Sequence, residues 1–252
     1  MSELVPMKPQ VYKDPRPAEY FDPFYKRARE HRPGVVYEIV RLFSSLLMWT
    51  VFRARSISAQ NVPGSGPVII APNHFSYADH FFVACFLRRR LHFMGKSQMF
   101  TGFLAHVYSR GGVFPVRRGH RDNEVFRTAH AVLARGGCLT MYCEGGRSRT
   151  GKLAEQARPG IGRIALESGA PVVPTAIYGS SRVRNYKRGE FPKVWVRYGK
   201  PIRWEPVDDP TREQQQEVAD QIFAEIRALY EEIEQLGPRE VARRERGARR
   251  ST

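Results

Sequence analysis

Short apolar runs alternate with segments of helical periodicity from about residue 51 to residue 237, and this alternation limits the possible folds more than any other feature. Runs such as PVIIAP (67–72) and PVVPTAIYG (171–179) contain no charged residue, as expected of strands buried inside a sheet. Strands that alternate with helices predict an α/β fold. We therefore expect a single domain whose mixed, mostly parallel central sheet is covered by helices, with no internal repeat.

The bounds of the expected elements follow from apolar spacing and from the positions of glycine and proline. The expected strands are 51–59, 67–72, 91–95, 111–116, 138–143, 171–179 and 193–202. The expected helices are 79–90, 122–135, 160–168 and a last helix from Asp209-Pro210 to Gly237-Pro238. The α/β domain should thus cover residues 55–237. The basic residues 238–252 are predicted to be a disordered tail, which either tethers the chain to a membrane or is merely solvated.

Residues 1–54 are expected to form a membrane-associating helical hairpin. The stretch 35–52 is mostly apolar, but it falls short of the roughly 20 apolar residues with few charges that a spanning helix needs. The preceding YFDPFYKRAREHR (20–32) places aromatic residues before a basic cluster, which favours a helix lying in the membrane interface. A buried core helix is the alternative. The first 17 residues lack the apolar core of a signal peptide.

The net charge of +16 indicates a polyanionic partner, which could be nucleic acid, an anionic lipid surface or a phosphorylated substrate. The three cysteines have no paired spacing, which favours a reducing compartment. The seven histidines are scattered, so no metal site is expected.

The motif NHFSYAD (73–79) places a histidine and an aspartate five positions apart, directly after an expected strand. On one continuous helix these side chains would point roughly 140° apart. The two can meet only if His74 lies on the loop after the strand and Asp79 lies in the first turn of the next helix, with Ser76 available to cap that helix. A histidine oriented by a carboxylate is a typical general base near neutral pH.

Three further strand ends carry polar or glycine-rich sequences: GGVFPVRR (111–118), EGGRSRTG (144–151) and VVPTAIYG (172–179). In α/β folds, sites lie at the carboxyl edge of the sheet, so these segments should gather beside NHFSYAD. In order and spacing, the four segments resemble the four motif blocks of the glycerolipid acyltransferases, specifically the 1-acylglycerol-3-phosphate acyltransferases. The resemblance covers about residues 67 to 180.

This resemblance implies transfer of a fatty acyl group from acyl-CoA or acyl-carrier protein to the sn-2 hydroxyl of 1-acyl-glycerol-3-phosphate, lysophosphatidic acid, without a bound cofactor. It also implies a peripheral or monotopic location on an anionic membrane surface, at the cytoplasmic face of the cell membrane. Another acceptor, such as glycerol-3-phosphate or another lysophospholipid, is the alternative within the family. A nonenzymatic protein that binds RNA or membrane is the alternative outside it, but no aromatic nucleic-acid motif is present and no nucleic-acid partner is expected.

The expected roles are carried over position by position. His74 is the catalytic base and Asp79 orients it, while Arg117 matches the arginine of the second block and is assigned to the acceptor phosphate. Arg118 is expected at the surface. The other residues expected to bind substrate are Asn73, Glu144, Gly145, Gly146 and Arg147.

The third block departs from the family pattern. It usually begins with Phe-Pro and has a small polar residue before its arginine, whereas this chain has Tyr142-Cys143 and Gly146 at those positions. Pro115 is likewise unusual in the second block. Cys143 raises a covalent alternative, in which its thiol is the nucleophile and His74 serves it.

Overall fold

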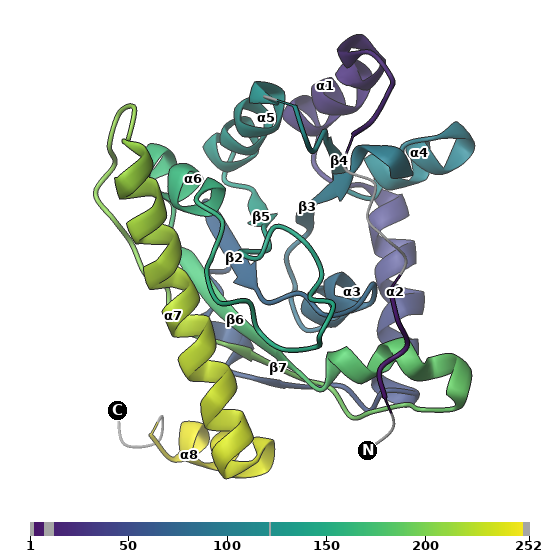
Figure 1. Cartoon of the computed structure of the whole chain (residues 1–252), viewed down its shortest axis with the longest axis vertical. Coiled ribbons are helices and arrows are strands. Elements are labelled where there is room, and N and C mark those ends of the chain that lie inside the picture. Colours follow the sequence, from purple (N-terminus) through teal and green to yellow (C-terminus); the bar gives the residue numbers. More distant parts are fainter. Residues whose placement is uncertain (1–2, 8–12, 121, 249–252) are drawn as a thin grey trace.

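Seven strands form one sheet, and its order is β1-β7-β6-β2-β5-β3-β4 (Figure 1). The structure, a computed structural model of the chain, describes residues 3–7, 13–120 and 122–248. The strands are β1 (Arg55–Ile57), β2 (Val68–Pro72), β3 (Leu91–Lys96), β4 (Val113–Val116), β5 (Cys138–Thr140), β6 (Val172–Tyr178) and β7 (Trp195–Tyr198). All neighbouring strands are parallel except β6 and β7, which are antiparallel. The predicted mixed, mostly parallel sheet is confirmed.

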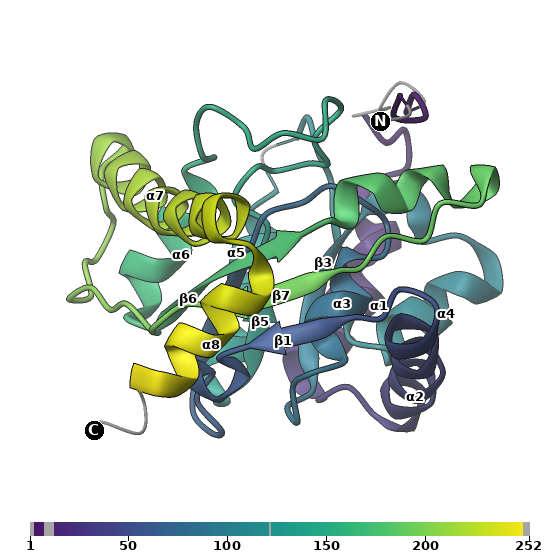
Figure 2. The ribbon, with the colours of Figure 1, turned by 90° about the horizontal axis from the view of Figure 1, so that it is seen from below.

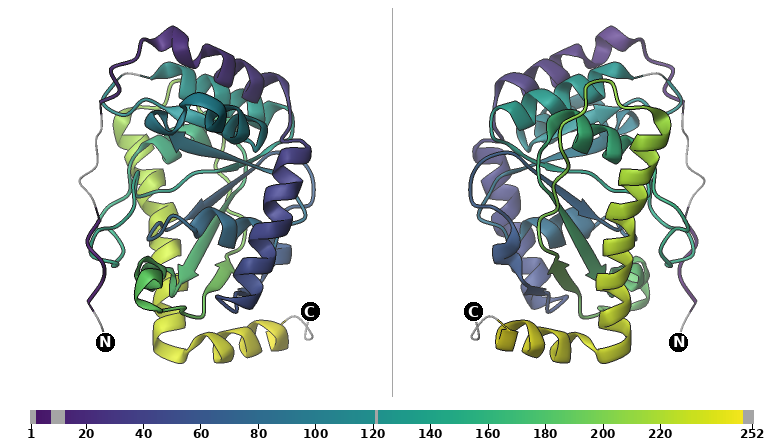
Figure 3. Two further views of the ribbon diagram at one scale, coloured as in Figure 1. Left: turned by 90° about the vertical axis from the view of Figure 1, so that its right-hand side faces the viewer. Right: turned by 90° about the vertical axis from the view of Figure 1, so that its left-hand side faces the viewer.

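Helices cover both faces of the sheet (Figures 2 and 3). The α-helices are α1 (Asp22–Glu30), α2 (Val35–Thr50), α3 (Asp79–Ala84), α4 (Gly102–Arg110), α5 (Asn123–Ala134), α6 (Gly160–Ser168), α7 (Arg212–Leu236) and α8 (Pro238–Ala248). The 3-10 helices are η1 (Ala18–Phe21), η2 (Ala59–Asn61), η3 (Ser97–Met99) and η4 (Ser180–Arg188).

Strand β2 shows why two cores form. Ile69 belongs to the apolar cluster that includes residues of α1, α5, α6 and α7, whereas its neighbours Val68 and Ile70 belong to the cluster that includes residues of α2 and α3. Successive side chains of a strand point to opposite faces, so a strand that is apolar at every position supplies both cores.

The expected disordered tail is wrong for Pro238–Ala248, which forms α8. Val241 is fully buried, and Arg197 of β7 forms ion pairs with Glu245 of α8 and with Glu232 of α7. These contacts hold the basic segment against the sheet edge. The last four residues of the predicted tail, 249–252, lie outside the described residues.

The expected start of the last long helix is also wrong. Helix α7 begins at Arg212, and its N-cap is Thr211 rather than Asp209. Thr211 and Gln214 form a capping box, in which each side chain accepts a hydrogen bond from the other residue's backbone N–H. This reciprocal arrangement satisfies two backbone donors that a helix start leaves open.

The two helices within the expected N-terminal hairpin occupy different environments. Helix α1 is part of the core, because Phe24, Tyr25 and Ala28 are buried against the α5 side of the sheet. Helix α2 buries Tyr37 and Met48 but leaves its outer face exposed. Within the described part of the chain, no helix is both long enough and apolar enough to cross a bilayer.

Candidate active site

The site lies at the carboxyl ends of β2 and β5, which are parallel neighbours with Ile70 opposite Thr140. The loop after β2 carries His74, and the long segment after β5 carries Tyr142 to Arg158. Because parallel strands end at the same sheet edge, the two loops meet there.

His74 and Asp79 form the pair that the motif predicts. The Nδ1 atom of His74 lies 2.8 Å from Oδ2 of Asp79. His74 is on the loop after β2, and Asp79 is the first residue of α3, so the pair straddles a strand-to-helix turn. The Asp79 carboxylate holds the proton on Nδ1, which leaves Nε2 as the basic nitrogen.

The turn is organised around the carboxylate of Asp79. Its Oδ2 accepts hydrogen bonds from the backbone N–H groups of Phe75 (2.6 Å) and Ser76 (2.8 Å), and Oδ1 accepts from the Ser76 hydroxyl. Ser76 does not cap α3, because the N-cap position belongs to Ala78. Three local donors therefore fix the carboxylate of Asp79.

Burial and neighbouring charges set the protonation states of the pair. Burial is the largest influence on His74 and lowers its pKa, and the cations Arg147 and Arg118 lower it further, while Asp79 opposes them. Burial alone would raise the pKa of Asp79, but its bonds to His74 and to the N–H of Ser76 outweigh this, so the net change is a decrease. The resting pair is a neutral imidazole beside a carboxylate.

Residues of the segment after β5 make three contacts with His74. The Tyr142 ring stacks on the imidazole with 3.9 Å between centroids and 19° between planes. Glu144 Oε1 accepts a hydrogen bond from the His74 backbone N–H (3.1 Å), and the His74 carbonyl accepts one from the Ser148 N–H (2.8 Å). Glu144, expected to bind substrate, is thus a hydrogen-bond partner of the His74 main chain.

Asn73 is fully buried and ties the end of β2 to β6. Its Oδ1 accepts from the Ile177 N–H (2.7 Å) and its Nδ2 donates to the Ile177 carbonyl (3.2 Å). These bonds occupy both ends of its amide, so the structure gives Asn73 a framework role.

A cavity of about 640 Å³ opens beside the pair, with a predominantly cationic lining. Its charged residues are Arg118, Glu144, Arg147, Arg149, Lys152 and Arg158. Burial raises the pKa of Glu144 to about 8, so this carboxyl group is mostly neutral at pH 7. A cavity with five cations and one neutral acid suits a ligand that carries phosphate.

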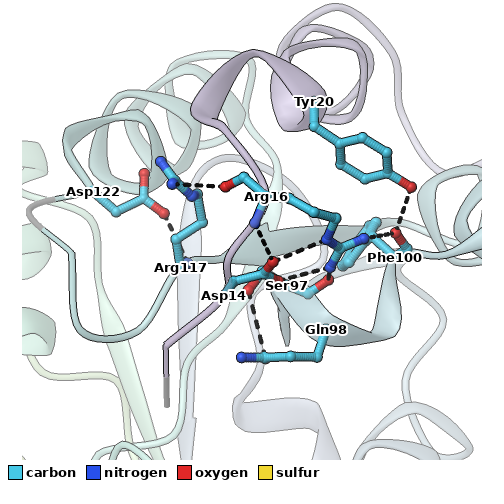
Figure 4. Close-up of polar contacts among 8 residues, drawn as sticks. All are labelled: Asp14, Arg16, Tyr20, Ser97, Gln98, Phe100, Arg117 and Asp122. Carbon is cyan, nitrogen blue, oxygen red and sulfur yellow. Dashed lines mark hydrogen bonds and ion pairs between the residues drawn. The ribbon is translucent and has the colours of Figure 1, made fainter. Parts of the chain in front are cut away.

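Arg117 and its neighbour Arg118 lie in different surroundings, and Figure 4 shows those of Arg117. The Arg117 side chain turns toward the N-terminal segment, where Nη2 donates to the Arg16 carbonyl (3.2 Å), and its backbone N–H donates to Asp122. Arg118, which was expected at the surface, is half-buried and lines the cavity.

Lys96, at the end of β3, is a residue that sequence reasoning missed. Burial lowers its pKa, and so do the positive charges of Arg118 and Arg147, which means that three cations converge there. The detectable signal was a lysine that ends an apolar strand at the same sheet edge as the other blocks.

The EGGR turn shapes the cavity. Gly145 has a φ of 65°, and a Cβ atom there would lie 2.9 Å from Cγ of Arg158. Glycine permits both the left-handed backbone and the close approach. Gly146 and Arg147 line the cavity, and the Arg147 guanidinium carbon lies 3.4 Å from the centroid of the Tyr77 ring.

Cys143 is a poor candidate for a nucleophile. It is buried, and burial raises the pKa of its thiol well above the usual range, with the charge of Glu144 acting in the same direction. A thiol of this kind stays protonated and unreactive. Among the described residues, no group of three or more His, Cys, Asp or Glu side chains could hold a metal ion.

Residues 53–178, half of the chain, match the family model described as Acyltransferase. The chain belongs to the acyltransferase family. The proposed resemblance to the glycerolipid acyltransferases is confirmed by relatives among well-characterised proteins. The chain is 25% identical over 223 residues to a glycerol-3-phosphate acyltransferase of Pseudomonas paraeruginosa, with 69% of this chain and 27% of that protein covered.

A second relative is the 1-acyl-sn-glycerol-3-phosphate acyltransferase BAT2 of Brassica napus, 24% identical over 165 residues, with 64% of this chain and 47% of that protein covered. The chain thus spans about a quarter of the length of the Pseudomonas relatives and about half that of the plant protein.

A solved structure shares the fold. The 1-acyl-sn-glycerophosphate acyltransferase of Thermotoga maritima superposes with a TM-score of 0.60 at 22% identity, with 83% of this chain and 89% of that chain covered.

Proposed function

We propose that this acyltransferase transfers a fatty acyl group from acyl-CoA or acyl-carrier protein to the sn-2 hydroxyl of 1-acyl-glycerol-3-phosphate, giving phosphatidic acid. The observation that carries the proposal is a neutral histidine held by a buried aspartate at the edge of a cationic cavity. The first feature suits activation of a hydroxyl, and the second suits an acceptor with a phosphate.

In the proposed mechanism, Nε2 of His74 removes the proton from the acceptor hydroxyl as its oxygen attacks the thioester carbonyl carbon. Asp79 stabilises the resulting imidazolium through Nδ1–H. The tetrahedral intermediate then collapses, the carbon–sulfur bond breaks, and the imidazolium returns its proton to the leaving thiolate. The products are an ester and a free thiol, and no enzyme-bound cofactor takes part.

We assign the acceptor phosphate to Arg118 and Arg147, which line the cavity and whose charges reach His74, together with Lys96, whose pKa they lower. Planar guanidinium groups bind phosphate oxygens in pairs, whereas a lysine acts as a point charge. Glycerol-3-phosphate is the second candidate acceptor, because it carries the same phosphate and several relatives bear its name.

We further propose that the protein works on the cytoplasmic face of a membrane, where the proposed acceptor lysophosphatidic acid and its product phosphatidic acid reside. The outer face of α2 supports this, since Leu42 and Phe43 are each 68% exposed and Leu46 is 60% exposed. On α4, Phe103 is 78% exposed. Such apolar side chains on a strongly basic protein suit an anionic lipid surface.

The decisive test is release of free thiol by the purified protein with acyl-CoA and a panel of acceptors. Lysophosphatidic acid is expected to give the highest kcat/KM, followed by glycerol-3-phosphate, with lysophosphatidylcholine far lower because its phosphate is a diester capped by choline. His74→Ala is expected to abolish the reaction in every case. Activity retained by His74→Ala would exclude the mechanism, and equal rates with all acceptors would exclude the phosphate assignment.

A further inference from the structure

The ring stack between Tyr142 and His74 joins the two loops of the site, and no motif-based role accounts for it. Tyr142 follows β5, and His74 follows β2. The ladder pairs Ile70 with Thr140, so continuing both chains by two residues brings Pro72 level with Tyr142. The register thus brings Tyr142 to the start of the loop that carries His74, and the ring contact itself completes the approach.

We propose that Tyr142 is a positioning residue, whose ring fixes the plane of the His74 imidazole and shields one of its faces from water. This proposal rests on the proposed function, in which His74 is the base. Proton transfer requires the basic nitrogen to be within hydrogen-bond reach of the acceptor hydroxyl, and small angular errors reduce the rate.

The hydrogen bond to Asp79 cannot define the plane by itself. A single contact at 2.8 Å fixes the direction of Nδ1 but allows the ring to turn about the line joining Nδ1 to the carboxylate oxygen. A flat ring with its centroid 3.9 Å away and tilted by only 19° restricts this rotation. The backbone bonds of His74 to Glu144 and Ser148 fix the main chain, and the Tyr142 ring restrains the imidazole itself.

The Tyr142 hydroxyl takes no part in this function. Its oxygen is buried and has no hydrogen-bond partner among the described residues. An unsatisfied buried polar group costs about 1–3 kcal/mol of folding free energy, so the hydroxyl destabilises the fold, and only the ring contributes to the contact with His74. This separation predicts that phenylalanine can replace the tyrosine.

The test compares Tyr142→Phe, which keeps the ring, with Tyr142→Leu and Tyr142→Met, which remove it. Phe126→Leu, in the partly buried face of α5, is the matched control for loss of an aromatic ring. Tyr142→Phe is expected to keep the wild-type kcat, whereas the two aliphatic variants should lose about 10- to 100-fold in kcat with less than about a threefold change in the KM of the acceptor.

The pH dependence of kcat/KM separates positioning from general damage. The charged and titratable groups around His74 are Asp79, His80, Arg118, Glu144 and Arg147, and the variants leave all five in place. Loss of the ring admits water to the imidazole, so the acidic limb of the profile should move to higher pH. An unchanged limb together with an unchanged kcat in both aliphatic variants would overturn the proposal, as would an equal loss in Tyr142→Phe.

An NMR titration of the His74 ring protons, assigned with His74→Ala, gives a readout that needs no activity. The midpoint should rise in Tyr142→Leu and Tyr142→Met but not in Tyr142→Phe or Phe126→Leu. If the wild type acylates no acceptor while this shift is seen, the proposed function fails and the positioning contact stands. If the wild type is active and the midpoint does not move, only the present proposal fails.

Discussion

At the scale of single residues, Glu144 has a protonation state opposite to that of an ordinary surface glutamate. Burial raises its pKa to about 8, while its Oε1 still accepts the hydrogen bond of the His74 N–H. A neutral acid of this kind resembles an amide in shape and charge. We predict that Glu144→Gln keeps at least about a third of the wild-type kcat/KM at pH 7, whereas Glu144→Ala loses about tenfold or more, because it leaves the backbone N–H of His74 unpaired.

The pH dependence of the folding stability of the wild type and of Glu144→Gln tests the protonation state of Glu144. A folded-state pKa above the unfolded value means that the native protein binds the extra proton, so the wild type should lose stability as pH rises from about 4.5 to about 8. Glu144→Gln should lack this part of the decline in urea denaturation curves. Parallel curves for the two proteins would show that Glu144 is ionised in the fold.

The adjacent residues Arg117 and Arg118 should contribute differently to binding of the acceptor. Arg118→Ala should raise the KM for lysophosphatidic acid by about tenfold or more, since a charge-assisted bond to phosphate contributes roughly 1.5–3 kcal/mol. Arg117→Ala should change the KM by less than about threefold and act mainly on thermal stability, because Arg117 contacts the N-terminal segment. Steady-state kinetics of both variants decide the matter, and the reverse order would assign the acceptor phosphate to Arg117.

Sequence reasoning reached the His74–Asp79 geometry because the five-residue spacing excludes a shared helix face and leaves one solution. It could not choose between Arg117 and Arg118 in the same way. Strand β4 ends at Val116, so both arginines lie beyond the strand, where the alternation of faces no longer applies. The loop path and the contact with Arg16 decide which side chain enters the cavity.

At the scale of elements, periodicity predicted the buried helices well, and it failed where tertiary contacts decide. Helix α6 was expected at 160–168 and has those bounds, since its apolar face is complete in the sequence. Helix α8 has one buried apolar residue, Val241, and depends on the pairing of Glu245 with Arg197 on β7. A partner that is 48 residues away in sequence leaves no mark on local periodicity.

An ion pair between Asp14 and Arg16 anchors the N-terminal segment before α1 (Figure 4). The buried carboxylate of Asp14 accepts hydrogen bonds from Nε (2.9 Å) and Nη2 (2.7 Å) of Arg16. The same guanidinium group also donates to the carbonyls of Ser97 and Phe100. Arg16→Ala leaves a buried carboxylate without its charge partner. The Arg16 side chain is 22% exposed and Asp14 keeps the backbone N–H of Arg16 as a donor, so the urea midpoint should fall, but by less than for a fully buried pair.

A companion variant separates loss of charge pairing from loss of packing. Asp14→Asn combined with Arg16→Met removes both charges and keeps the side-chain bulk, so it should be more stable than Arg16→Ala. Trypsin should cleave Arg16→Ala after Lys13 faster than it cleaves the wild type, because the anchor of that segment is lost. Equal midpoints for wild type and Arg16→Ala would show that this ion pair contributes nothing to the fold.

At the scale of the whole molecule, the fold class followed from the order of elements, but the arrangement of the strands did not. Parallel neighbours such as β2 and β5 lie about 70 residues apart in the chain, and β7 joins the sheet antiparallel beside β6. Long-range pairing of this kind depends on the packing of the two helix layers, which no local pattern records. The net charge of +16 is likewise a property of the entire surface, and it concerns association rather than fold.

The exposed apolar face of α2 and the positive net charge should together bind the protein to an anionic membrane surface. Leu42→Glu combined with Phe43→Glu places two carboxylates on residues that are 68% exposed in the free protein, so folding should be unaffected. Binding to vesicles containing phosphatidylserine should fall by about tenfold or more, because full burial of each apolar side chain contributes about 1.5–3 kcal/mol. Leu236→Glu, at the end of α7, is the control for an added surface carboxylate and should lose much less binding than the α2 variant. Vesicle sedimentation at rising salt measures both contributions: salt should weaken the electrostatic part in all variants, while the difference between the α2 variant and the control should persist. Equal sedimentation of the α2 variant and the control at every salt concentration would exclude α2 as the membrane-facing helix.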